Sequence, residues 1–496
     1  MTMNLDDIFR DTARRQPEKP AILGDQDPIS YRHLDEAIGA ATHALRAAGL
    51  RAGDCVGLHL PSGANTIIFT YAVWRSGGCA VPLPVELAAA EKQEICRDIN
   101  LDFVLSQGRA DAFFEPFRKH DPVELPSGLF ALPVASPREH PSGFDAINSA
   151  FIRFTSGTTG TSKGVVLSHE TIYDRIHAAN DVLHIGPDDR VLWLLSMNYH
   201  FAVSIVSYLS FGAAIILPPN QFAPAVLDSV ERHGATLMYG APTHYAWLAG
   251  YEQGRGFPGL RLALSTTTAI PTETAERFRR RFGLPVVQAF GIIEAGLPFI
   301  NIDFAADRPE AVGRVLPAYR LRLDDVGLGP RLLEILVGGR GFLDAYYRPW
   351  RLRAEIMPDG WFRTGDLGEA DGDGCLFIRG RSKEVISVGG MKFFPQEVEA
   401  VLASHHGVDS ACVFARPDSR LGEVPWAHVV PRRRGSALSE RELQDFCRER
   451  LAGYKVPERI EFVTALQRTG SGKILHRDID PLADRGDSRA SGKSVG

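Results

Sequence analysis

The eleven residues from Phe154 to Gly164 read FTSGTTGTSKG, and the pattern on either side of them decides how the fold is interpreted. They comprise three glycines, four threonines, two serines, one lysine and one phenylalanine. Such a composition suits a linker, a surface turn or a phosphate-binding loop. A P-loop requires glycine directly before its lysine and serine or threonine directly after it. Ser162 and Gly164 stand at those positions, so this stretch is not a P-loop.

The segments on either side of this loop predict two β-strands. Residues 149–154 (SAFIRF) and 164–168 (GVVLS) are rich in apolar, β-branched and aromatic side chains, and a helical pattern begins only at 169–176 (HETIYDRI). Because a strand follows the loop, no helix N-terminus stands directly behind it to bind phosphate. A phosphate would instead meet backbone N–H groups, hydroxyls and the ammonium group of Lys163.

The composition predicts a soluble globular protein with several domains. The chain has 496 residues, 44% hydrophobic residues and a formal net charge of −5, which does not favour binding to nucleic acid. Its six cysteines form no C-x-x-C pair, as expected for reduced thiols. The N-terminus lacks the apolar segment of a signal peptide. The longest uncharged stretch, 201–221, predicts a buried helix and a buried strand rather than a membrane span. We therefore expect a cytoplasmic protein.

Short apolar runs alternate with helical patterns along most of the chain. Buried strands are predicted at 54–60, 212–218, 235–241 and 284–290, and helices at 31–49 and 270–283. This alternation is typical of an α/β fold with largely parallel sheets.

The same patterns predict the division of the chain into domains. We expect a large N-terminal domain at 1–380, built from parallel-sheet α/β subdomains together with a small β-rich subdomain at 331–381. A mobile α+β C-terminal domain is expected at 381–483. The polar residues 484–496 are expected to be disordered.

Five motifs in order along the chain resemble those of the adenylate-forming superfamily, which includes acyl- and aryl-CoA synthetases, peptide-synthetase adenylation domains and luciferases. The motifs are FTSGTTGTSKGVVLSH, WFRTGDLG, GRSKEVISVGGMKFFPQEVE, LAGYKVPERI and QRTGSGKILHR. The resemblance implies an AMP-forming ligase that converts a carboxylic acid and ATP to acyl-AMP and pyrophosphate, and then acylates a pantetheine thiol. The cofactors implied are ATP, Mg²⁺ and CoA or carrier-protein phosphopantetheine.

The resemblance also implies roles for individual residues. Asp366 resembles the residue that binds the ribose hydroxyls, and Arg381 resembles the second residue that contacts the ribose or phosphate. Lys473 resembles the lysine that bridges the acid and the α-phosphate. Lys383 resembles the hinge of the mobile domain. The implied nucleotide-binding residues are Thr155, Ser156, Gly157, Thr158, Thr159, Gly160, Lys163, Thr267, Thr268, Phe290, Gly291, Asp366, Ile378, Arg381 and Lys473.

Two segments depart from the motifs of the family. The stretch FGIIE keeps Phe290, whose ring can stack on adenine, and Glu294, which resembles the Mg²⁺ ligand. Ile293 replaces a threonine whose hydroxyl would touch the α-phosphate; losing such a hydrogen bond costs roughly 1.5–3 kcal/mol. The stretch STTTAIP, 265–271, replaces a glycine-rich segment. These departures keep a non-catalytic nucleotide-binding homologue as an alternative, which the retained aspartate, arginine and lysine oppose.

The acyl pocket is expected from the stretches LLSMNYHFAVS and YGAPTHYAWL. Tyr199, Met238 and Tyr239 favour an apolar fatty acid or an aryl acid, but they are equally typical of a core. Ala202 stands where amino-acid-activating members carry an aspartate, so a free α-amino acid is disfavoured. His200 aligns with a residue near the acyl carboxylate; the alternative is a histidine at the edge of a buried helix. The candidate catalytic residues are therefore Lys473, Glu294 and His200.

The acceptor thiol is expected to be that of CoA. The stretch ISVGGMK resembles the segment that lines the pantetheine channel, where Gly389 and Gly390 would let a narrow arm pass close to the backbone. A ligase that loads a separate acyl carrier protein is the alternative.

Overall fold

The computed structural model describes residues 2–108, 114–135, 139–155, 163–253, 256–328, 332–432 and 438–466. Contacts divide the chain into two compact units. Unit 1 comprises Met1–Val326, Arg331–Thr364 and Gly368–Ile378, and unit 2 comprises Gly327–Pro330, Gly365–Leu367 and Arg379–Gly496. The main boundary thus falls two residues before the predicted position. The predicted tail at 484–496 lies outside the described residues.

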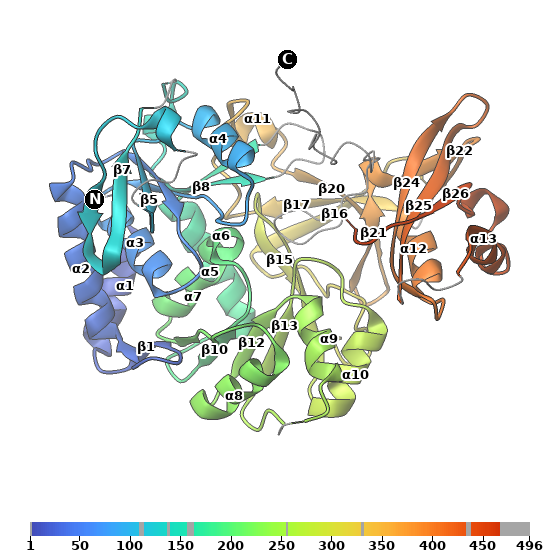
Figure 1. Ribbon diagram of the computed structural model, residues 1–496, viewed down its shortest axis with the longest axis horizontal. Helices are drawn as coiled ribbons and strands as arrows, with labels where there is room; N and C mark the ends of the chain where they lie inside the picture. Colours follow the sequence, from blue (N-terminus) through green and yellow to red (C-terminus); the bar gives the residue numbers. More distant parts are fainter. Residues whose placement is uncertain are drawn as a thin grey trace, which may run out of the picture. The chain divides into compact units, whose positions relative to one another are not determined.

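The first sheet of unit 1 has eight strands in the order β15-β14-β13-β12-β10-β11-β1-β2 (Figure 1). They are β1 (Pro20–Leu23), β2 (Ile29–Ser30), β10 (Arg190–Trp193), β11 (Ala214–Ile216), β12 (Leu237–Gly240), β13 (Leu262–Ser265), β14 (Val286–Ile292) and β15 (Gly296–Ile300). The six strands from β14 to β1 pair in parallel. Their near-continuous burial is typical of a sheet covered on both faces. The strands predicted at 212–218, 235–241 and 284–290 are confirmed.

The second sheet of unit 1 has nine strands in the order β19-β18-β9-β8-β4-β3-β5-β7-β6. They are β3 (Cys55–His59), β4 (Cys79–Pro82), β5 (Phe103–Ser106), β6 (Val123–Leu125), β7 (Leu129–Pro133), β8 (Ser149–Thr155), β9 (Lys163–Ser168), β18 (Ala345–Tyr346) and β19 (Arg351–Leu352). β8 and β9 pair antiparallel and flank the glycine-rich loop, which confirms the predicted strand–loop–strand arrangement.

Helices join the two sheets through one continuous apolar core. They include α1 (Leu5–Arg15), α2 (Tyr31–Ala47), α3 (Ala64–Arg75) and α5 (His169–Leu183). Phe9 of α1, Trp74 of α3 and Ile172 of α5 belong to the same buried cluster as Val56 of β3 and Val191 of β10. The indole N–H of Trp74 also donates to the carbonyl oxygen of Ala150 at 2.7 Å. The two sheets therefore share a core and form one unit.

Unit 1 contains seven further α-helices among the described residues. They are α4 (Ala89–Asp98), α6 (Met197–His200), α7 (Ile205–Ser210), α8 (Ala223–His233), α9 (Pro242–Gly250), α10 (Thr272–Phe282) and α11 (Arg353–Ile356). α7 followed by β11 matches the buried helix and strand predicted for 201–221. The predicted helices at 31–49 and 270–283 correspond to α2 and α10.

The β-rich segment predicted at 331–381 contributes to two different sheets. A four-stranded sheet has the order β16-β17-β20-β21, formed by β16 (Tyr319–Asp325), β17 (Leu333–Gly339), β20 (Phe362–Ala370) and β21 (Leu376–Arg381). β18 and β19 pair instead with the nine-stranded sheet. The composition of the segment predicts strands, but their partners depend on contacts that are distant in sequence.

Unit 2 has an α+β architecture. Its sheet contains β22 (Ile386–Val388), β23 (Met391–Phe393), β24 (Val408–Asp418), β25 (Gly422–Pro431) and β26 (Arg459–Phe462), and its helices are α12 (Pro395–Ala403) and α13 (Glu440–Arg448). Val398 of α12, Val413 of β24 and Leu443 of α13 meet in a separate buried core. Unit 2 therefore has the core of an independent folding unit.

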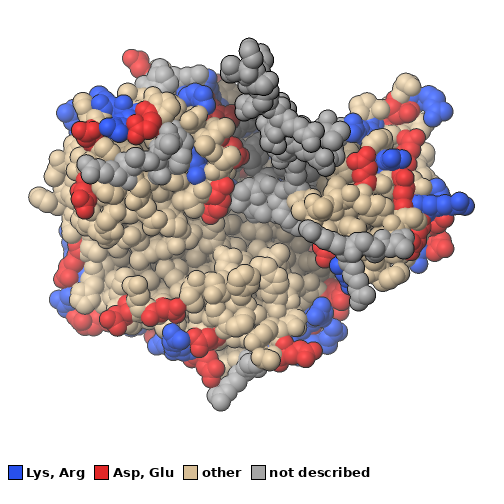
Figure 2. All heavy atoms as spheres, in the orientation of Figure 1, with Lys and Arg blue, Asp and Glu red and all other residues tan. Residues whose placement is uncertain are grey.

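Acidic and basic side chains are interspersed on the face shown in Figure 2.

No helix among the described residues is long and apolar enough to cross a lipid bilayer.

The buried His169 makes the stability of unit 1 sensitive to acid. His169 is 3% exposed, its Nδ1 accepts a hydrogen bond from the Leu5 N–H at 3.2 Å, and burial lowers its pKa to about 4. An unfolded histidine binds a proton near pH 6.5. The folded state is therefore destabilised as the pH falls from about 6.5 to about 4, by on the order of 3 kcal/mol.

We expect His169→Gln to flatten the fall in unfolding temperature between pH 6.5 and pH 4, measured by circular dichroism. His43→Gln, at an exposed position of α2, is the matched control and should retain the wild-type slope. Equal slopes in wild type and His169→Gln would contradict the prediction.

Candidate functional site

Lys163 is the first residue of β9 and lies at the base of the glycine-rich loop. Its Nζ is 4.7 Å from the centre of the Tyr346 ring, within the range of a cation–π contact. Tyr346 belongs to β18, which pairs with β9 so that Tyr346 faces Val165 across the ladder. The side chain of Thr155 and the predicted residues Ser156, Gly157, Thr158, Thr159 and Gly160 lie outside the described residues.

The Tyr346 hydroxyl connects Lys163 to the predicted metal ligand. Its O–H donates to Glu294 Oε1 at 3.1 Å. Burial and the neighbouring carboxylate both raise the pKa of Tyr346, so the phenol stays protonated and remains a donor. The structure thus brings together Lys163 and Glu294, which are far apart in the sequence, through a tyrosine that no sequence motif singled out.

Glu294 occupies the turn between β14 and β15. The backbone is tightly packed there, because a Cβ on Gly291 would lie 2.7 Å from the carbonyl oxygen of Gly296. Gly296 itself has φ +87°, a conformation that favours glycine. The turn therefore holds the Glu294 carboxylate at the end of a narrow hairpin.

A buried arginine of α5 stabilises this turn through hydrogen bonds to its backbone. The guanidinium of Arg175 donates to the carbonyl oxygens of Ile293 and Glu294, at 2.8 Å each, and to that of Gly341. Burial lowers the pKa of Arg175 to about 10, so it remains protonated at neutral pH. The carbonyl oxygens hold the cation, and these hydrogen bonds of Arg175 do not involve the Glu294 carboxylate, which accepts from Tyr346.

Arg153 adds a second positive charge near Glu294. It lies in β8, its Nη1 donates to the carbonyl oxygen of Tyr199 at 2.6 Å, and its guanidinium carbon is 5.3 Å from the centre of the Tyr199 ring. Burial lowers the pKa of Arg153, while the Glu294 charge raises it. Its Nε is buried and makes no hydrogen bond within the described part of the chain. Sequence reasoning missed Arg153, although a cation in an apolar strand was a usable signal.

Glu294 could supply a single carboxylate ligand to Mg²⁺. Among the described residues, no group of three His, Cys, Asp or Glu side chains could hold a metal ion. Mg²⁺ commonly binds one or two carboxylates and completes its coordination with waters and substrate phosphates. Glu294 is one half-buried carboxylate, and the Tyr346 hydroxyl bonds one of its oxygens, which is compatible with that mode of binding.

Two of the predicted nucleotide-binding residues border the large core of unit 1. Phe290 and Ile378 are both partly buried and pack against the large cluster of unit 1, as does Ile293. Phe290 lies 6.0 Å from Phe299 between ring centroids and is opposite it in the β14–β15 ladder.

Thr267 has an unusual backbone conformation. It follows β13 and has φ +81°, which is costly for a β-branched residue. Its neighbours differ: Thr266 is buried and its N–H donates to the Gly240 carbonyl oxygen at 3.1 Å, whereas Thr268 is exposed. The position that requires a glycine-like backbone is therefore Thr267.

The predicted acyl-pocket residues do not all lie together. His200 ends α6, and its ring centroid lies 6.3 Å from that of Tyr239 and 6.2 Å from that of Trp193, which sequence reasoning missed. Ala202 is buried in the same core cluster as Tyr239. Met238 points to the opposite face of the sheet and packs in a different cluster. The structure therefore separates Met238 from Tyr239.

Unit 2 brings together two other predicted residues. The Arg381 Nε lies 3.0 Å from Asp366 Oδ1, and Asp366 is 4% exposed. Lys383, the predicted hinge, is exposed in a 3₁₀ turn at Ser382–Glu384. Lys473 lies outside the described residues.

Gly389 and Gly390 connect β22 to β23. Both have positive φ, +56° and +85°, as a two-residue hairpin turn of type I′ requires. Turn geometry by itself therefore explains both glycines, and the pantetheine role stays a prediction.

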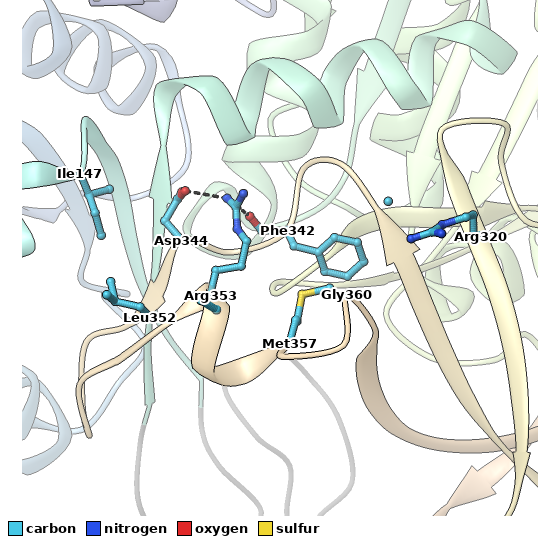
Figure 3. A pocket seen from close by; sticks show the side chains of 10 residues that line it. Ile147, Arg320, Phe342, Asp344, Leu352, Arg353, Met357 and Gly360 are labelled. Atoms are coloured by element: carbon cyan, nitrogen blue, oxygen red, sulfur yellow. Dashed lines mark hydrogen bonds and ion pairs between the residues drawn. The ribbon is translucent and has the colours of Figure 1, made fainter.

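A pocket of about 530 Å³ lies elsewhere in unit 1 (Figure 3). Two of its three charged residues pair with each other: Arg353 forms an ion pair with Asp344 at 2.6 Å and donates to the Phe342 carbonyl oxygen, and Asp344 Oδ2 accepts from the Ser168 N–H. The third, Arg320, lies over the Trp361 ring. None of the predicted site residues lines this pocket, so we assign it no function.

The chain belongs to the AMP-binding enzyme family. The family's main domain matches residues 9–347, and the C-terminal domain of AMP-binding enzymes matches residues 397–473.

Similar proteins cover nearly the whole chain. A feruloyl-CoA synthase from Amycolatopsis sp. is 30% identical over 480 residues, which span 94% of this chain and 96% of that protein. ATP-bound MatB from Rhodopseudomonas palustris has a TM-score of 0.82 at 26% identity, covering 95% and 97% of the two chains. The o-succinylbenzoate CoA synthetase of Bacillus subtilis, in complex with its acyl-adenylate, has a TM-score of 0.82 at 25% identity, covering 99% and 100%.

These comparisons confirm the predicted superfamily, the α/β fold and the class of enzyme, an AMP-forming acid–thiol ligase. They also confirm, for that class, the activation of an acid as acyl-AMP and its transfer to CoA. The roles of individual residues are not tested by them.

We expect Thr267→Gly to stabilise unit 1. Glycine relieves a backbone strain of about 1–3 kcal/mol, partly offset by its greater freedom in the unfolded chain. The unfolding temperature should rise, as measured by differential scanning calorimetry. Thr268→Gly, at a neighbouring position without positive φ, should leave it unchanged or lower it. A comparable decrease in both variants would contradict the strain at Thr267.

We expect Arg175→Met to destabilise unit 1 by on the order of 3 kcal/mol or more, because three carbonyl oxygens lose a charged donor. The measurement is urea-induced unfolding followed by tryptophan fluorescence. Arg280→Met, which replaces an exposed arginine of α10, is the control and should shift the midpoint little. A similar midpoint in both variants would refute the anchoring role of Arg175.

Proposed function

We propose that this enzyme activates an apolar or aryl carboxylic acid, and favours an aryl acid. The feruloyl-CoA synthase and the o-succinylbenzoate CoA synthetase similar to this chain are both named for aryl acids. The rings of His200, Trp193 and Tyr239 gather where the sequence predicts the acyl pocket. Ala202 supplies no carboxylate to bind an α-ammonium group.

The observation that carries the proposed site is the contact chain from Lys163 through Tyr346 to Glu294. Lys163 and the loop before it would bind the β- and γ-phosphates of ATP. Glu294 would hold Mg²⁺, which neutralises phosphate charge when bound. Tyr346 donates to one carboxylate oxygen and thereby orients the other. Arg153 adds positive charge on the same side.

This arrangement suits a reaction that needs charge stabilisation rather than proton transfer. The attacking carboxylate is already ionised at neutral pH, so no general base is required. The barrier comes from bringing an anion to a phosphorus atom surrounded by negative oxygens, and fixed cations lower it. Lys163 and Arg153 are such cations, and Lys473 is proposed as a third.

The remaining roles follow the sequence motifs. Asp366 and Arg381 would bind the ribose, and their 3.0 Å contact is compatible with a shared ligand. Lys383 would act as the hinge about which unit 2 rotates between two orientations. Gly389 and Gly390 would border the pantetheine arm. CoA is the proposed acceptor, and a separate carrier protein is the alternative.

Tyr346→Phe tests the proposed metal ligand. Removing a hydroxyl that orients a metal-binding carboxylate commonly costs 10- to 100-fold in metal affinity or activity. We expect the Mg²⁺ concentration for half-maximal pyrophosphate release to rise by about that factor. Tyr347→Phe is the matched control, because the Tyr347 hydroxyl bonds His140 and not Glu294. This variant should keep the wild-type Mg²⁺ dependence.

An unchanged Mg²⁺ dependence in Tyr346→Phe would contradict the role of Glu294. The acceptor is tested in the same preparation by supplying either CoA or a phosphopantetheinylated carrier protein and identifying the acylated thiol by mass spectrometry. If no acid of a broad panel leads to pyrophosphate release, that result would instead support a non-catalytic homologue.

A further inference from the structure

The eight-stranded sheet contains a topological switch point between β10 and β12. From β10 the chain proceeds to β11 on one side and then returns to β12 on the other. In open α/β sheets, ligands bind outside the carboxyl ends of the two strands where the strand order reverses. The carboxyl ends of β10 and β12 are therefore a position for a ligand on topology alone.

Two aromatic residues mark this point. Trp193 is the last residue of β10, Tyr239 is the last but one of β12, and the two are register partners on the same face of the sheet. Their ring centroids are 5.5 Å apart, and they are only 3% and 2% exposed. His200, from the predicted acyl pocket, lies near both rings.

Both residues carry a buried polar atom without a hydrogen bond. Within the part of the chain that the structure describes, neither Trp193 Nε1 nor Tyr239 Oη finds a partner of acceptable geometry. Burial raises the pKa of Tyr239 to about 12, and a hydrogen-bond-type interaction with the Thr266 side chain lowers it in part, although its geometry falls short of a hydrogen bond. Buried polar groups are nearly always bonded, and each orphan costs about 1–3 kcal/mol. Two adjacent orphans at a switch point indicate a missing polar partner.

We propose that Trp193 and Tyr239 bind a hydrogen-bond-accepting substituent, best a hydroxyl, on the ring of an aromatic acid. An indole N–H can only donate, so the ligand group must accept. A phenol can donate or accept, so one substrate hydroxyl can accept from Trp193 and donate to Tyr239. An alkyl chain would leave both groups unsatisfied. This inference rests on the proposed function and names its substrate class.

The experiment compares three acids of one series with the full-length enzyme: an aryl acid that carries a ring hydroxyl, its methyl isostere and the unsubstituted acid. Activation is measured as kcat/KM for pyrophosphate release. We expect the hydroxyl acid to exceed the methyl isostere by about 10-fold or more, as expected where a site's polar groups would otherwise stay unpaired. In Trp193→Phe and Tyr239→Phe this ratio should fall toward one.

Controls separate substrate recognition from folding. Trp247→Phe and Tyr251→Phe make the same replacements at a 45% exposed tryptophan and at a tyrosine bonded to Gln253, and should keep the wild-type ratio. Because Tyr239→Phe removes only a hydroxyl without a hydrogen bond, this variant should unfold at or above the wild-type temperature. Trp193→Phe also removes buried ring volume, so it should unfold at a lower temperature. If Trp193→Phe fails to fold, the ratio of kcat/KM values measured in Tyr239→Phe alone tests the inference.

Several outcomes would overturn the inference. A wild-type enzyme without preference for the hydroxyl acid would show that water satisfies these groups. A preference retained in both variants would place recognition elsewhere. An equal loss for all three acids in Trp193→Phe would mean that the indole contacts the reacting carboxylate. Each leaves the proposed function intact, whereas failure of every acid in a broad panel to release pyrophosphate would refute that function itself.

Discussion

The candidate site of unit 1 depends on the buried guanidinium of Arg175. This one side chain donates to carbonyl oxygens of two segments, the β14–β15 turn at Ile293 and Glu294 and the residue Gly341. It lies on α5, which continues directly from β9. The helix that follows the glycine-rich hairpin therefore fixes the turn that carries the candidate metal ligand. Burying a cation is tolerated here because rigid carbonyl dipoles replace its water.

The proposed site on this anchor would use charge rather than proton transfer. Lys163 and Arg153 come from the two strands of one hairpin, Glu294 from another hairpin, and Tyr346 from a short strand added to the edge of β9. A half-buried cluster of fixed charges requires little reorganisation when a polyanion binds. The turn that carries Ile293 and Glu294 is held through its backbone carbonyl groups, so the apolar side chain of Ile293 is compatible with this anchoring.

Much of the fold could be predicted from the sequence, but less of the site. Buried strands and amphipathic helices follow from local periodicity, and β11, β12, β14, α2 and α10 lie where it placed them. The motifs indicated Lys163, Glu294, Asp366 and Arg381. Tyr346 and Trp193 were missed because nothing local distinguishes them from core aromatics. Met238 was grouped with Tyr239 because they are adjacent, although alternate residues of a strand face opposite sides of the sheet.

The sequence by itself determined the family, the reaction class and the two-strand setting of the glycine-rich loop, because ordered motifs and hydrophobic periodicity are local properties. Only the tertiary structure decided which polar groups share a site. In the folded chain, Tyr346 lies between Lys163 and Glu294, and Arg153 contacts Tyr199. Trp193 and Tyr239 are register partners at the point where the strand order reverses. Such proximity depends on strand order and register, which arise from contacts between distant segments and leave no local pattern in the chain.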